Sequence, residues 1–347
     1  MNPEPLRIAV IGAGSIGRRH IDLIAVEPAG RLVAIAEPDP GATDLAKASS
    51  AKYFSGYQSL LAQEQLDGVI VAAPNALHAA IGVACADHGL PFLMEKPVTD
   101  TVENGLQLIE AATAAKVRAQ VGHHRRFDPA VEEAHRIIHS GELGTIAAGS
   151  GIWFVRKHDE YYDVPWRTSG PGGGPLLINL IHDIDMLRYW FGEVESVYAE
   201  TTSRHRTLPV EDSGAILFRF ASGPLITMTF SDSTPSPWGW ERNSGDNPHT
   251  PAVNENCYRF AGTKAALEFP NLAIWGEGSS WLDPLTREPR PTRPRKALAD
   301  QLTHFCEVIQ GESPRVTLAD GLANLAVVEA VAESARTKAP VVPRYKP

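Results

Sequence analysis

The sequence predicts an α/β domain built on a parallel sheet, followed by an α+β domain with an open, mostly antiparallel sheet. β-prone apolar runs alternate with helical segments over the first 120 residues, as in parallel strands joined by helices. After about Arg125, apolar residues recur at every second position in runs separated by short turns, as in antiparallel hairpins. A length of 347 residues exceeds what one core usually serves, so we expect two domains, 1–125 and 126–347.

Composition and charge narrow the class of protein. A hydrophobic content of 43% and a charged content of 21% are ordinary for a globular chain, and a net charge of −9 argues against nucleic-acid binding. No apolar run approaches the length of a membrane span, and a strand by Leu6 leaves no room for a signal peptide. Cys85, Cys257 and Cys306 are far apart, which predicts free thiols in a reducing compartment and no metal site. We therefore expect a cytoplasmic enzyme.

The first 39 residues predict a Rossmann nucleotide-binding domain. An apolar run, Leu6–Ile11, leads directly into Gly-Ala-Gly-Ser-Ile-Gly at positions 12–17. A second apolar run, Leu32–Ala36, ends on Glu37. Strand, glycine turn, helix, strand and acid follow one another in the dinucleotide-binding order.

Each glycine of this turn has its own expected purpose. Gly12 permits the tight turn off the strand, Gly14 lets a pyrophosphate approach the backbone, and Gly17 lets the helix pack against the strand. The helix that starts near Ser15 and Ile16 directs free N–H groups at the phosphates.

The acid at the end of the second strand predicts the cofactor. Glu37 lies 20 positions after Gly17, near the spacing of the carboxylate that binds the adenosine ribose. A carboxylate accepts hydrogen bonds from ribose hydroxyls and repels a 2′-phosphate, and Pro38-Asp39-Pro40 supplies no cation beside it. We expect NAD rather than NADP.

Further strands of the first domain end in polar residues. Predicted strands at 67–73, 91–94 and 118–121 alternate with helices at about 77–88 and 102–115. Ligands of parallel sheets bind beyond the carboxyl ends of the strands, so these polar residues should border the nucleotide crevice: Pro74-Asn75, Glu95-Lys96-Pro97 and His123-His124-Arg125-Arg126. An ammonium at Lys96 would stabilise charge on a substrate oxygen, although a surface lysine on a loop is an equally open reading.

The second half carries hairpin patterns and one long loop. A helix is expected at 129–139, and hairpins pair 215–220 with 225–230 and 257–261 with 265–269. Residues 231–256 form a loop whose tryptophans, Trp238 and Trp240, argue against disorder. Residues 318–338 are expected to form an Ala-rich amphipathic helix.

A histidine-containing helix follows a glycine run at 172–174. An apolar stripe comprises Leu177, Leu180, Ile184 and Leu187. Asn179, His182 and Asp185 are spaced i, i+3, i+6 and would share the opposite face. An imidazole between an amide and a carboxylate suits acid–base chemistry, but the same pattern also describes a solvated polar face.

These motifs, taken in order, resemble the Gfo/Idh/MocA oxidoreductases, whose members include glucose–fructose oxidoreductase and inositol dehydrogenase. The resemblance runs nearly end to end and rests on the following segments: Gly12–Gly17, Pro74–His78, Glu95-Lys96-Pro97, Arg125–Pro129, His182–Asp185 and Asp320-Gly321. It implies the fold described above and a homodimer or homotetramer formed through the second sheet.

The resemblance also implies roles for individual residues. Lys96 would be the active-site lysine, held by a cis bond to Pro97, and His182 the proton-transfer residue. Asn75 and His78 would lie near the nicotinamide ribose, together with Pro74 and Glu95 around the cofactor, and His124 and Arg125 would face the substrate. Family members often carry Asp four positions before the histidine, where this chain has Ile178 next to Asn179. Asn179 would then orient His182, and Asp185 would supply the missing charge.

The resulting hypothesis is an NAD-dependent dehydrogenase for a sugar, a sugar derivative or an inositol-like cyclic polyol. His182 would take the hydroxyl proton and Lys96 would stabilise the alkoxide. Candidate walls of a polyol pocket are Tyr161, Tyr162, Trp166, Arg167, Trp238 and Trp240. Two alternatives stay open: an NAD-dependent glycosidase acting by transient oxidation and elimination, and a non-catalytic NAD-binding regulator.

Overall fold

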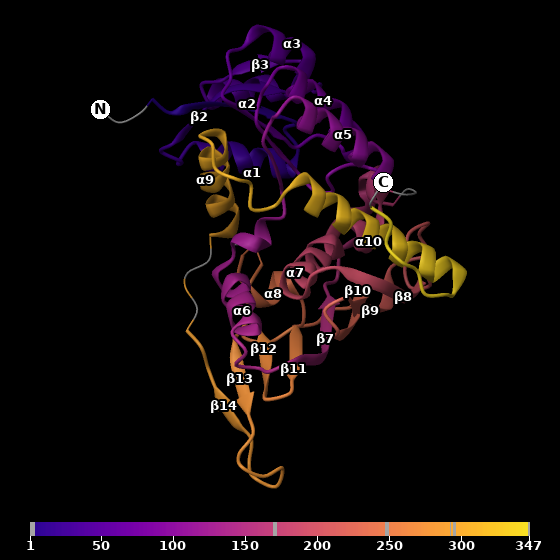
Figure 1. The fold of residues 1–347 in the computed structure, drawn as a ribbon. Helices are drawn as coiled ribbons and strands as arrows, with labels where there is room; N and C mark the ends of the chain where they lie inside the picture. The colour runs from indigo at the N-terminus through magenta and orange to yellow at the C-terminus, as the bar shows by residue number, and fades with distance from the viewer. Residues whose placement is uncertain (1–3, 169–171, 247–249, 292, 294–295, 346–347) are drawn as a thin grey trace. The chain divides into compact units, whose positions relative to one another are not determined.

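The computed structural model describes residues 4–168, 172–246, 250–291, 293 and 296–345. The chain divides into two compact units (Figure 1). The first is built from Met1–His124 and Leu298–Leu325, and the second from Arg125–Ala297 and Ala326–Lys346. The sequence pattern assigns all of 126–347 to the second domain, whereas the segment 298–325 groups with the first unit.

The first unit contains a six-stranded sheet whose neighbouring strands all pair in parallel. In chain order its strands are β1 (Leu6–Ile11), β2 (Gly30–Ala36), β3 (Lys52–Phe54), β4 (Gly68–Val71), β5 (Phe92–Met94) and β6 (Ala119–Val121). They lie in the order β3-β2-β1-β4-β5-β6, so the direction of winding reverses between β1 and β4. Open parallel sheets bind ligands at this reversal, beyond the carboxyl ends of the strands.

Helices connect these strands. They are α1 (Ser15–Ile24), α2 (Ala42–Ala48), α3 (Tyr57–Gln63), the short 3₁₀ turn η1 (Asn75–Leu77), α4 (His78–Asp87) and α5 (Val102–Ala114). The helix expected at 77–88 thus begins as a 3₁₀ turn. Isoleucines of α1 pack with Ile8, Val10 and Ile35 of the strands in one buried cluster. Parallel strands covered in this way show continuous apolar runs, as Leu6–Ile11 does.

The α9 helix (Ala297–Ile309) explains why the chain returns to the first unit. Its Leu302, Phe305 and Val308 belong to the buried cluster of the first sheet. The approach is close, since a Cβ added to Gly68 would lie 2.4 Å from the Cδ1 atom of Ile309. The apolar face of α9 therefore completes the core of the first unit.

The second unit contains an eight-stranded sheet in the order β14-β13-β12-β11-β7-β10-β9-β8. Its strands are β7 (Ile146–Phe154), β8 (Val194–Thr202), β9 (Ser213–Phe220), β10 (Leu225–Ser231), β11 (Tyr258–Gly262), β12 (Ala265–Phe269), β13 (Ala273–Gly276) and β14 (Thr286–Glu288). Among the strands that the structure describes in this sheet, only β7 and β10 pair in parallel. Every second residue of β10 is buried, as the period-2 pattern predicted, so the fold class of both domains is confirmed.

Helices and turns complete this unit. They are η2 (His124–Phe127), α6 (Pro129–His139), η3 (Asp159–Asp163), η4 (Pro165–Arg167), the π-helical turn η6 (Leu176–Leu180), α7 (Ile181–Phe191) and α8 (Trp240–Asn243), and α10 (Leu318–Thr337) extends into it from the first unit. Trp190 of α7 lies among Phe260, Phe269 and Tyr258 of the sheet and donates its indole N–H to the Val131 carbonyl. This aromatic cluster anchors α7 on the sheet.

Two expectations change in detail. The loop 231–256 contains the short helix α8, and its residues 247–249 lie outside the described residues. The helix α10 is not amphipathic in its middle, because residues 321–328 are buried all round, Asn324 included. This stretch contains leucines, alanines and valines and no charged residue, so it can be buried on every side without burying a charge.

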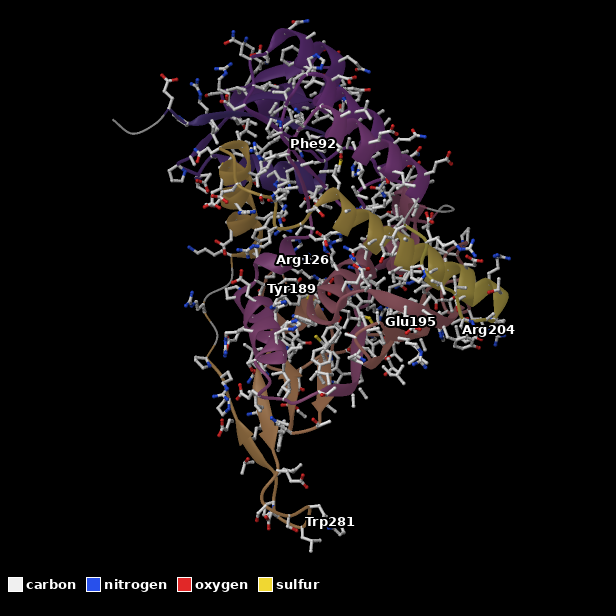
Figure 2. All side chains as sticks on the ribbon, viewed as in Figure 1. Phe92, Arg126, Tyr189, Glu195, Arg204 and Trp281 are labelled. Carbon is white, nitrogen blue, oxygen red and sulfur yellow. The ribbon has the colours of Figure 1, made fainter. Side chains whose placement is uncertain are left out.

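The β13–β14 hairpin extends from one edge of the second sheet (Figure 1), and Figure 2 labels Trp281 near its tip. Trp281 is 83% exposed. Among the residues that the structure describes, no helix has the length and apolar character needed to cross a bilayer.

Candidate active site

The three glycines of the turn differ in how closely other atoms pack around them. Gly12 has a φ of +95°, and a Cβ there would lie 2.4 Å from the Ala72 carbonyl oxygen. A Cβ on Gly17 would lie 2.0 Å from the carbonyl oxygen of Gly12. A Cβ on Gly14 would meet nothing within 4 Å. The fold therefore requires the first and third glycines, while the second borders open space.

The N-terminus of α1 faces the same space. Gly14 is its N-cap residue, and no side chain caps the helix. Gly14 and Ser15 are exposed and Ile16 is half-buried. The first N–H groups of an uncapped helix, with the positive end of the dipole, form a site for an anion such as pyrophosphate.

The carboxylate of Glu37 lies directly beside the glycine turn. It accepts a hydrogen bond of 2.7 Å from the backbone N–H of Ala13 and one of 3.2 Å from that of Asp39. The side chain is half-buried. Its charge is therefore held where the sequence places the adenosine ribose.

The residues that follow β4 are divided between exposed and buried positions. Pro74 is exposed and Asn75, in η1, is half-buried. His78 is buried, and its ring nitrogens lie 2.8 Å from the carbonyl oxygens of Pro97 and Ala73. Burial lowers the pKa of His78. The hydrogen bonds to these carbonyls act in the opposite direction and raise it, but the effect of burial is larger. The described contacts of its ring therefore join two backbone turns beside Lys96-Pro97 and Ala73.

Lys96 follows β5, two strands from the glycine turn in the same sheet. The Lys96-Pro97 peptide bond is cis, as the resemblance implied. Lys96 is half-buried, whereas its neighbour Glu95 is buried, with its carboxylate bound to His20 and to the backbone N–H of Lys96. Because β1, β4 and β5 are adjacent, Gly14, Asn75 and Lys96 all lie at the carboxyl edge of one sheet. His124, half-buried, follows β6 at the same edge.

In the second unit, the helix that carries His182 differs from its expected form. Leu176–Leu180 is a π-helical turn, so Asn179 and His182 do not have the regular α-helical spacing that we assumed. His182 is 7% and Asp185 0% exposed, so the interpretation as a solvated polar face is wrong. Asn179 is half-buried.

The π-helical turn has a specific support. Gly174 has a φ of +82°, and a Cβ there would lie 2.6 Å from a carboxylate oxygen of Glu211. That carboxylate accepts the N–H of Leu176 at 2.9 Å, satisfying one of the free donors at the start of the turn. π-helical turns of this kind often occur at functional sites.

Two buried ion pairs hold the carboxylates one and three positions after His182. Arg125 donates to Asp183 at 3.0 Å, and Arg126 forks onto both oxygens of Asp185 at 2.7–3.1 Å. Burial alone would lower the pKa of Arg125, but the carboxylates of Asp183 and Glu241 raise it. We expected Arg125 to face the substrate. The contacts that the structure describes for its guanidinium are with the carboxylates of Asp183 and Glu241.

Sequence reasoning missed Asp183, Arg126, Glu241 and Tyr258 as members of this network. Tyr258 donates its hydroxyl to Asp183, and the Arg125 guanidinium lies 4.9 Å from the ring centre of Trp240. Trp240, expected as a wall of a polyol pocket, is buried and packs against this arginine. One sequence feature could have revealed this network: two carboxylates lie in a helix otherwise rich in large apolar residues. Such a helix is expected to be buried, and buried carboxylates need buried partners.

Three expected substrate residues do lie together. The Arg167 guanidinium lies 4.1 Å from the ring centre of Tyr161 and 5.6 Å from that of Trp166, and it donates to the Tyr161 carbonyl at 2.8 Å. Trp166 is 47% exposed. Tyr162 instead donates its hydroxyl to Asp232. The cluster offers aromatic faces and a cation, both useful for a hydroxylated ligand.

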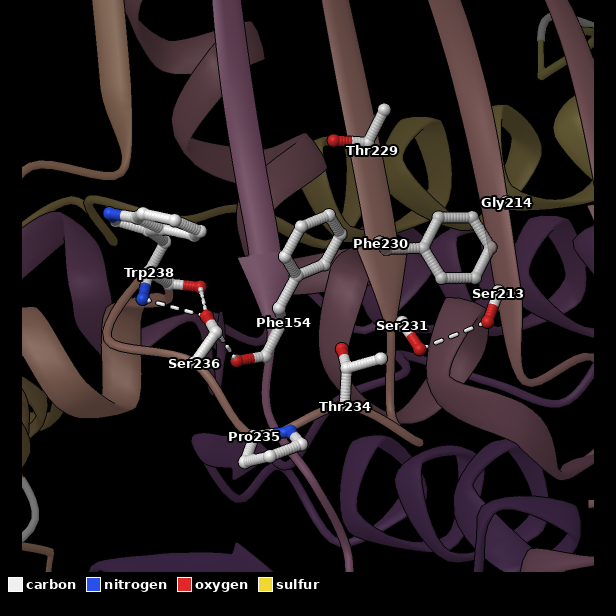
Figure 3. Close-up of a pocket in the computed structure, with 10 residues that line it drawn as sticks. All are labelled: Phe154, Ser213, Gly214, Thr229, Phe230, Ser231, Thr234, Pro235, Ser236 and Trp238. Atoms are coloured by element: carbon white, nitrogen blue, oxygen red, sulfur yellow. Dashed lines mark hydrogen bonds between the residues drawn. The ribbon is translucent and has the colours of Figure 1, made fainter. Parts of the chain in front are cut away.

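A surface hollow of about 370 Å³ lies near the ends of β7, β9 and β10 (Figure 3). Trp238 and Phe154 line it, and Ser213 donates to Ser231 on its floor. It contains none of the residues discussed above as catalytic or cofactor-binding.

Comparison with known proteins identifies the class to which this fold and these motifs belong. A family model described as an oxidoreductase family with an NAD-binding Rossmann fold matches residues 6–123, and the GFO/IDH/MocA C-terminal domain model matches residues 131–268. The chain belongs to the GFO/IDH/MocA oxidoreductase family.

Individual relatives agree with this assignment. The chain is similar to inositol 2-dehydrogenase of Corynebacterium glutamicum, with 31% identity over 58% of this chain and 59% of the relative. It is similar to scyllo-inositol 2-dehydrogenase (NAD(+)) of Bacillus subtilis, with 27% identity over 97% and 96% of the two chains. Among solved structures, the WlbA dehydrogenase of Bordetella pertussis in complex with NADH and UDP-GlcNAcA superposes with a TM-score of 0.81 and 25% identity, covering 99% of this chain and 100% of that one.

Proposed function

We propose that this protein is an NAD-dependent dehydrogenase that oxidises a carbinol of a sugar, a sugar derivative or an inositol-like polyol, or reduces the corresponding ketone. The observation that carries the proposal is the shared carboxyl edge of the first sheet. There the open glycine turn follows β1, the Glu37 carboxylate follows the neighbouring strand β2, and Lys96 follows β5, which β4 separates from β1 in the same parallel sheet. The names of the relatives, two inositol dehydrogenases and a WlbA dehydrogenase in complex with NADH and UDP-GlcNAcA, support the same chemistry.

The residues of this chain divide the work of cofactor binding. The N–H groups at the start of α1 hold the pyrophosphate, and the Glu37 carboxylate accepts hydrogen bonds from the hydroxyls of the adenosine ribose. Asn75 borders the nicotinamide ribose. Bound NAD supplies the acceptor for a hydride from the substrate carbon. The repulsion between the Glu37 carboxylate and a 2′-phosphate favours NAD over NADP.

Lys96 and His182 handle the substrate oxygen and its proton. The Lys96 ammonium stabilises negative charge on the oxygen, and the His182 imidazole takes the hydroxyl proton. Asn179, from the π-helical turn, and His124 are proposed to orient the substrate hydroxyls, and Tyr161, Trp166 and Arg167 to form a wall. Asp185 and Arg125, each held in a buried ion pair, are proposed to position the helix that carries His182.

A substrate panel tests this proposal. Sugars, inositols and sugar acids are incubated with NAD and NADP separately, and NADH formation is followed at 340 nm. We expect oxidation of at least one cyclic polyol or sugar with NAD, and much slower oxidation with NADP. Substrate loss without net NADH would indicate the glycosidase alternative, and NAD binding with no substrate turnover would indicate a regulator.

We also propose a cytoplasmic location and a homodimer or homotetramer. All three thiols are buried and unpaired, in keeping with a reducing compartment. Tyr198, Leu217 and Leu225 are exposed on neighbouring strands of the second sheet. A second copy of the chain would cover them.

A further inference from the structure

His20 is a buried polar residue that the proposed chemistry does not use. It lies on α1, where it shares the buried face with Gly17, Ile21 and Ile24, and its exposed fraction is 0%. An aliphatic side chain would fill such a position without the cost of desolvating an imidazole. The partner of His20 therefore needs an explanation.

That partner is the carboxylate of Glu95. The Nε2 atom of His20 lies 2.8 Å from Oε1 of Glu95, and both side chains are buried. The second oxygen, Oε2, accepts the backbone N–H of Lys96 at 3.2 Å. One carboxylate thus joins the helix of the glycine turn to the residue proposed to act on the substrate.

The carboxylate has little freedom to move. A Cβ added to Gly122 would lie 2.9 Å from both Cδ and Oε2 of Glu95, so the chain after β6 closes over it. The backbone N–H of Glu95 is itself bonded to the Val71 carbonyl at 2.9 Å. Packing and hydrogen bonds from three segments fix its position.

The carboxylate is also charged at neutral pH. Burial alone would raise the pKa of Glu95, but the hydrogen bond and charge of His20, with the charges of Lys96 and His124, lower it to about 2. A buried carboxylate that loses a hydrogen-bond donor is left with an unmet requirement and shifts toward the nearest remaining donors.

We propose that His20 is a positioning residue for Lys96: by holding the Glu95 carboxylate, it fixes the Lys96 backbone relative to the nucleotide-binding helix. This inference rests on the proposed role of Lys96. A displacement of about 1 Å at a reacting group can cost 10²-fold in rate, so the contact is relevant to turnover although His20 touches no substrate.

The test compares two substitutions. His20→Leu removes the donor at similar size, and His20→Gln keeps an N–H donor near the position of Nε2. With the substrate that the panel identifies, we expect His20→Leu to lower kcat about tenfold or more, with KM for NAD changed less than about threefold. We expect His20→Gln to recover most of the loss. Equal kcat in His20→Leu and the wild type would overturn the inference.

A second readout does not depend on turnover. Lysines are labelled by reductive ¹³C-methylation, and the Lys96 signal is assigned by its absence from Lys96→Arg. We expect this signal to titrate at a different pH in His20→Leu than in the wild type, because the Glu95 anion is no longer held in the same place relative to the Lys96 amine. Unchanged titration of Lys96 in a folded His20→Leu protein would contradict the proposal.

Asn324→Leu is the matched control. Asn324 is equally buried in the first unit and pairs with His123 at 3.1 Å. If His20 acts through Lys96, Asn324→Leu should leave kcat and the Lys96 titration unchanged at a similar loss of thermal stability. An equal fall in kcat in both variants would assign the effect of His20→Leu to general destabilisation and overturn the proposal.

A double-mutant cycle separates this inference from the proposed function. In a Lys96→Ala background, His20→Leu should change the residual kcat less than about twofold, and a full tenfold effect there would overturn the inference. Normal turnover of Lys96→Ala would instead contradict the proposed function, and the Lys96 titration would then decide whether His20 sets the environment of that amine.

Discussion

Single residues in the glycine turn differ in ways that the motif does not reveal. The sequence shows three glycines at 12, 14 and 17 and predicts a purpose for each. The structure supplies the distances: Gly12 and Gly17 leave no room for a methyl group, whereas Gly14 does. A glycine that the protein's own packing does not require points to a ligand.

Alanine substitutions should therefore act differently at these positions. We expect Gly17→Ala to destabilise the protein by about 2–3 kcal/mol, because its Cβ would meet a backbone carbonyl. We expect Gly14→Ala to leave the urea midpoint unchanged and to weaken NAD binding about tenfold or more. Urea unfolding and calorimetric NAD titration measure both effects, and a destabilised Gly14→Ala with normal NAD binding would contradict the assignment.

Glu95 predicts a pH dependence of stability. Its folded-state pKa is about 2 and its ordinary value 4.5, so its contribution to stability is complete above pH 4.5 and is lost as pH falls toward 2. We expect Glu95→Gln to flatten the fall in unfolding free energy between pH 4.5 and 2.5. The measurement is a series of urea midpoints across that range, and parallel curves for the two proteins would refute the prediction.

At the scale of elements, two arginines hold the helix of His182. Arg126 contacts both oxygens of Asp185 and also lies over the ring of Tyr189, 5.3 Å from its centre; Figure 2 labels both residues. The side chains of Arg126 and Asp185 are 7% and 0% exposed. Breaking such a pair leaves a buried charge, while replacing both members with apolar residues removes the charge altogether.

The single and the double substitution of this pair should therefore differ in how much unfolding free energy they cost. We expect Arg126→Met to cost about 3–5 kcal/mol of unfolding free energy, and Arg126→Met with Asp185→Leu to cost much less. The half-exposed pair of Glu133 and Arg136 on α6 is the control, where Glu133→Gln should change stability by less than about 1 kcal/mol. If the double substitution cost as much unfolding free energy as the sum of the two single substitutions, the two residues would not stabilise the protein as a coupled pair.

Sequence patterns predicted many elements and missed others, among them the strands β7 and β8 and the helix α9. Period-2 alternation located β9 and β10 because one face of the second sheet is buried, and α6 matched its expected span because Asp128 and Pro129 mark its start. The strand β3 was missed because three residues, one of them the exposed Lys52, are too few to show a period. The π-helical turn before His182 depends on Glu211, which lies far away in sequence.

At the scale of the whole molecule, the sequence predicted two domains and not the return of the chain to the first. α9 resembles any amphipathic helix in sequence, and only its packing against Ile8 and Ile70 assigns it to the first sheet. The candidate site likewise consists of residues that local sequence patterns reveal and of contacts that they do not. Strand ends revealed Lys96 and Asn75, whereas the partners of Arg125, Arg126 and His20 are contacts between distant segments that no local pattern encodes.

The exposed apolar residues of the second sheet predict the oligomeric state. Leu217 and Tyr198 are directly paired across β9 and β8, and each is more than one-third exposed. We expect light scattering after size-exclusion chromatography to show a dimer or tetramer, and Leu217→Lys to shift it toward smaller species with an unchanged circular dichroism spectrum. A wild-type monomer at micromolar concentration would contradict this prediction.

The most direct test of the account is the turnover of Lys96→Ala and His182→Ala with NAD and the substrate found in the panel. We predict that kcat falls about 10²-fold or more in each variant, while NAD binding, measured separately by calorimetry, persists. Near-normal turnover in both variants would contradict the assigned chemistry.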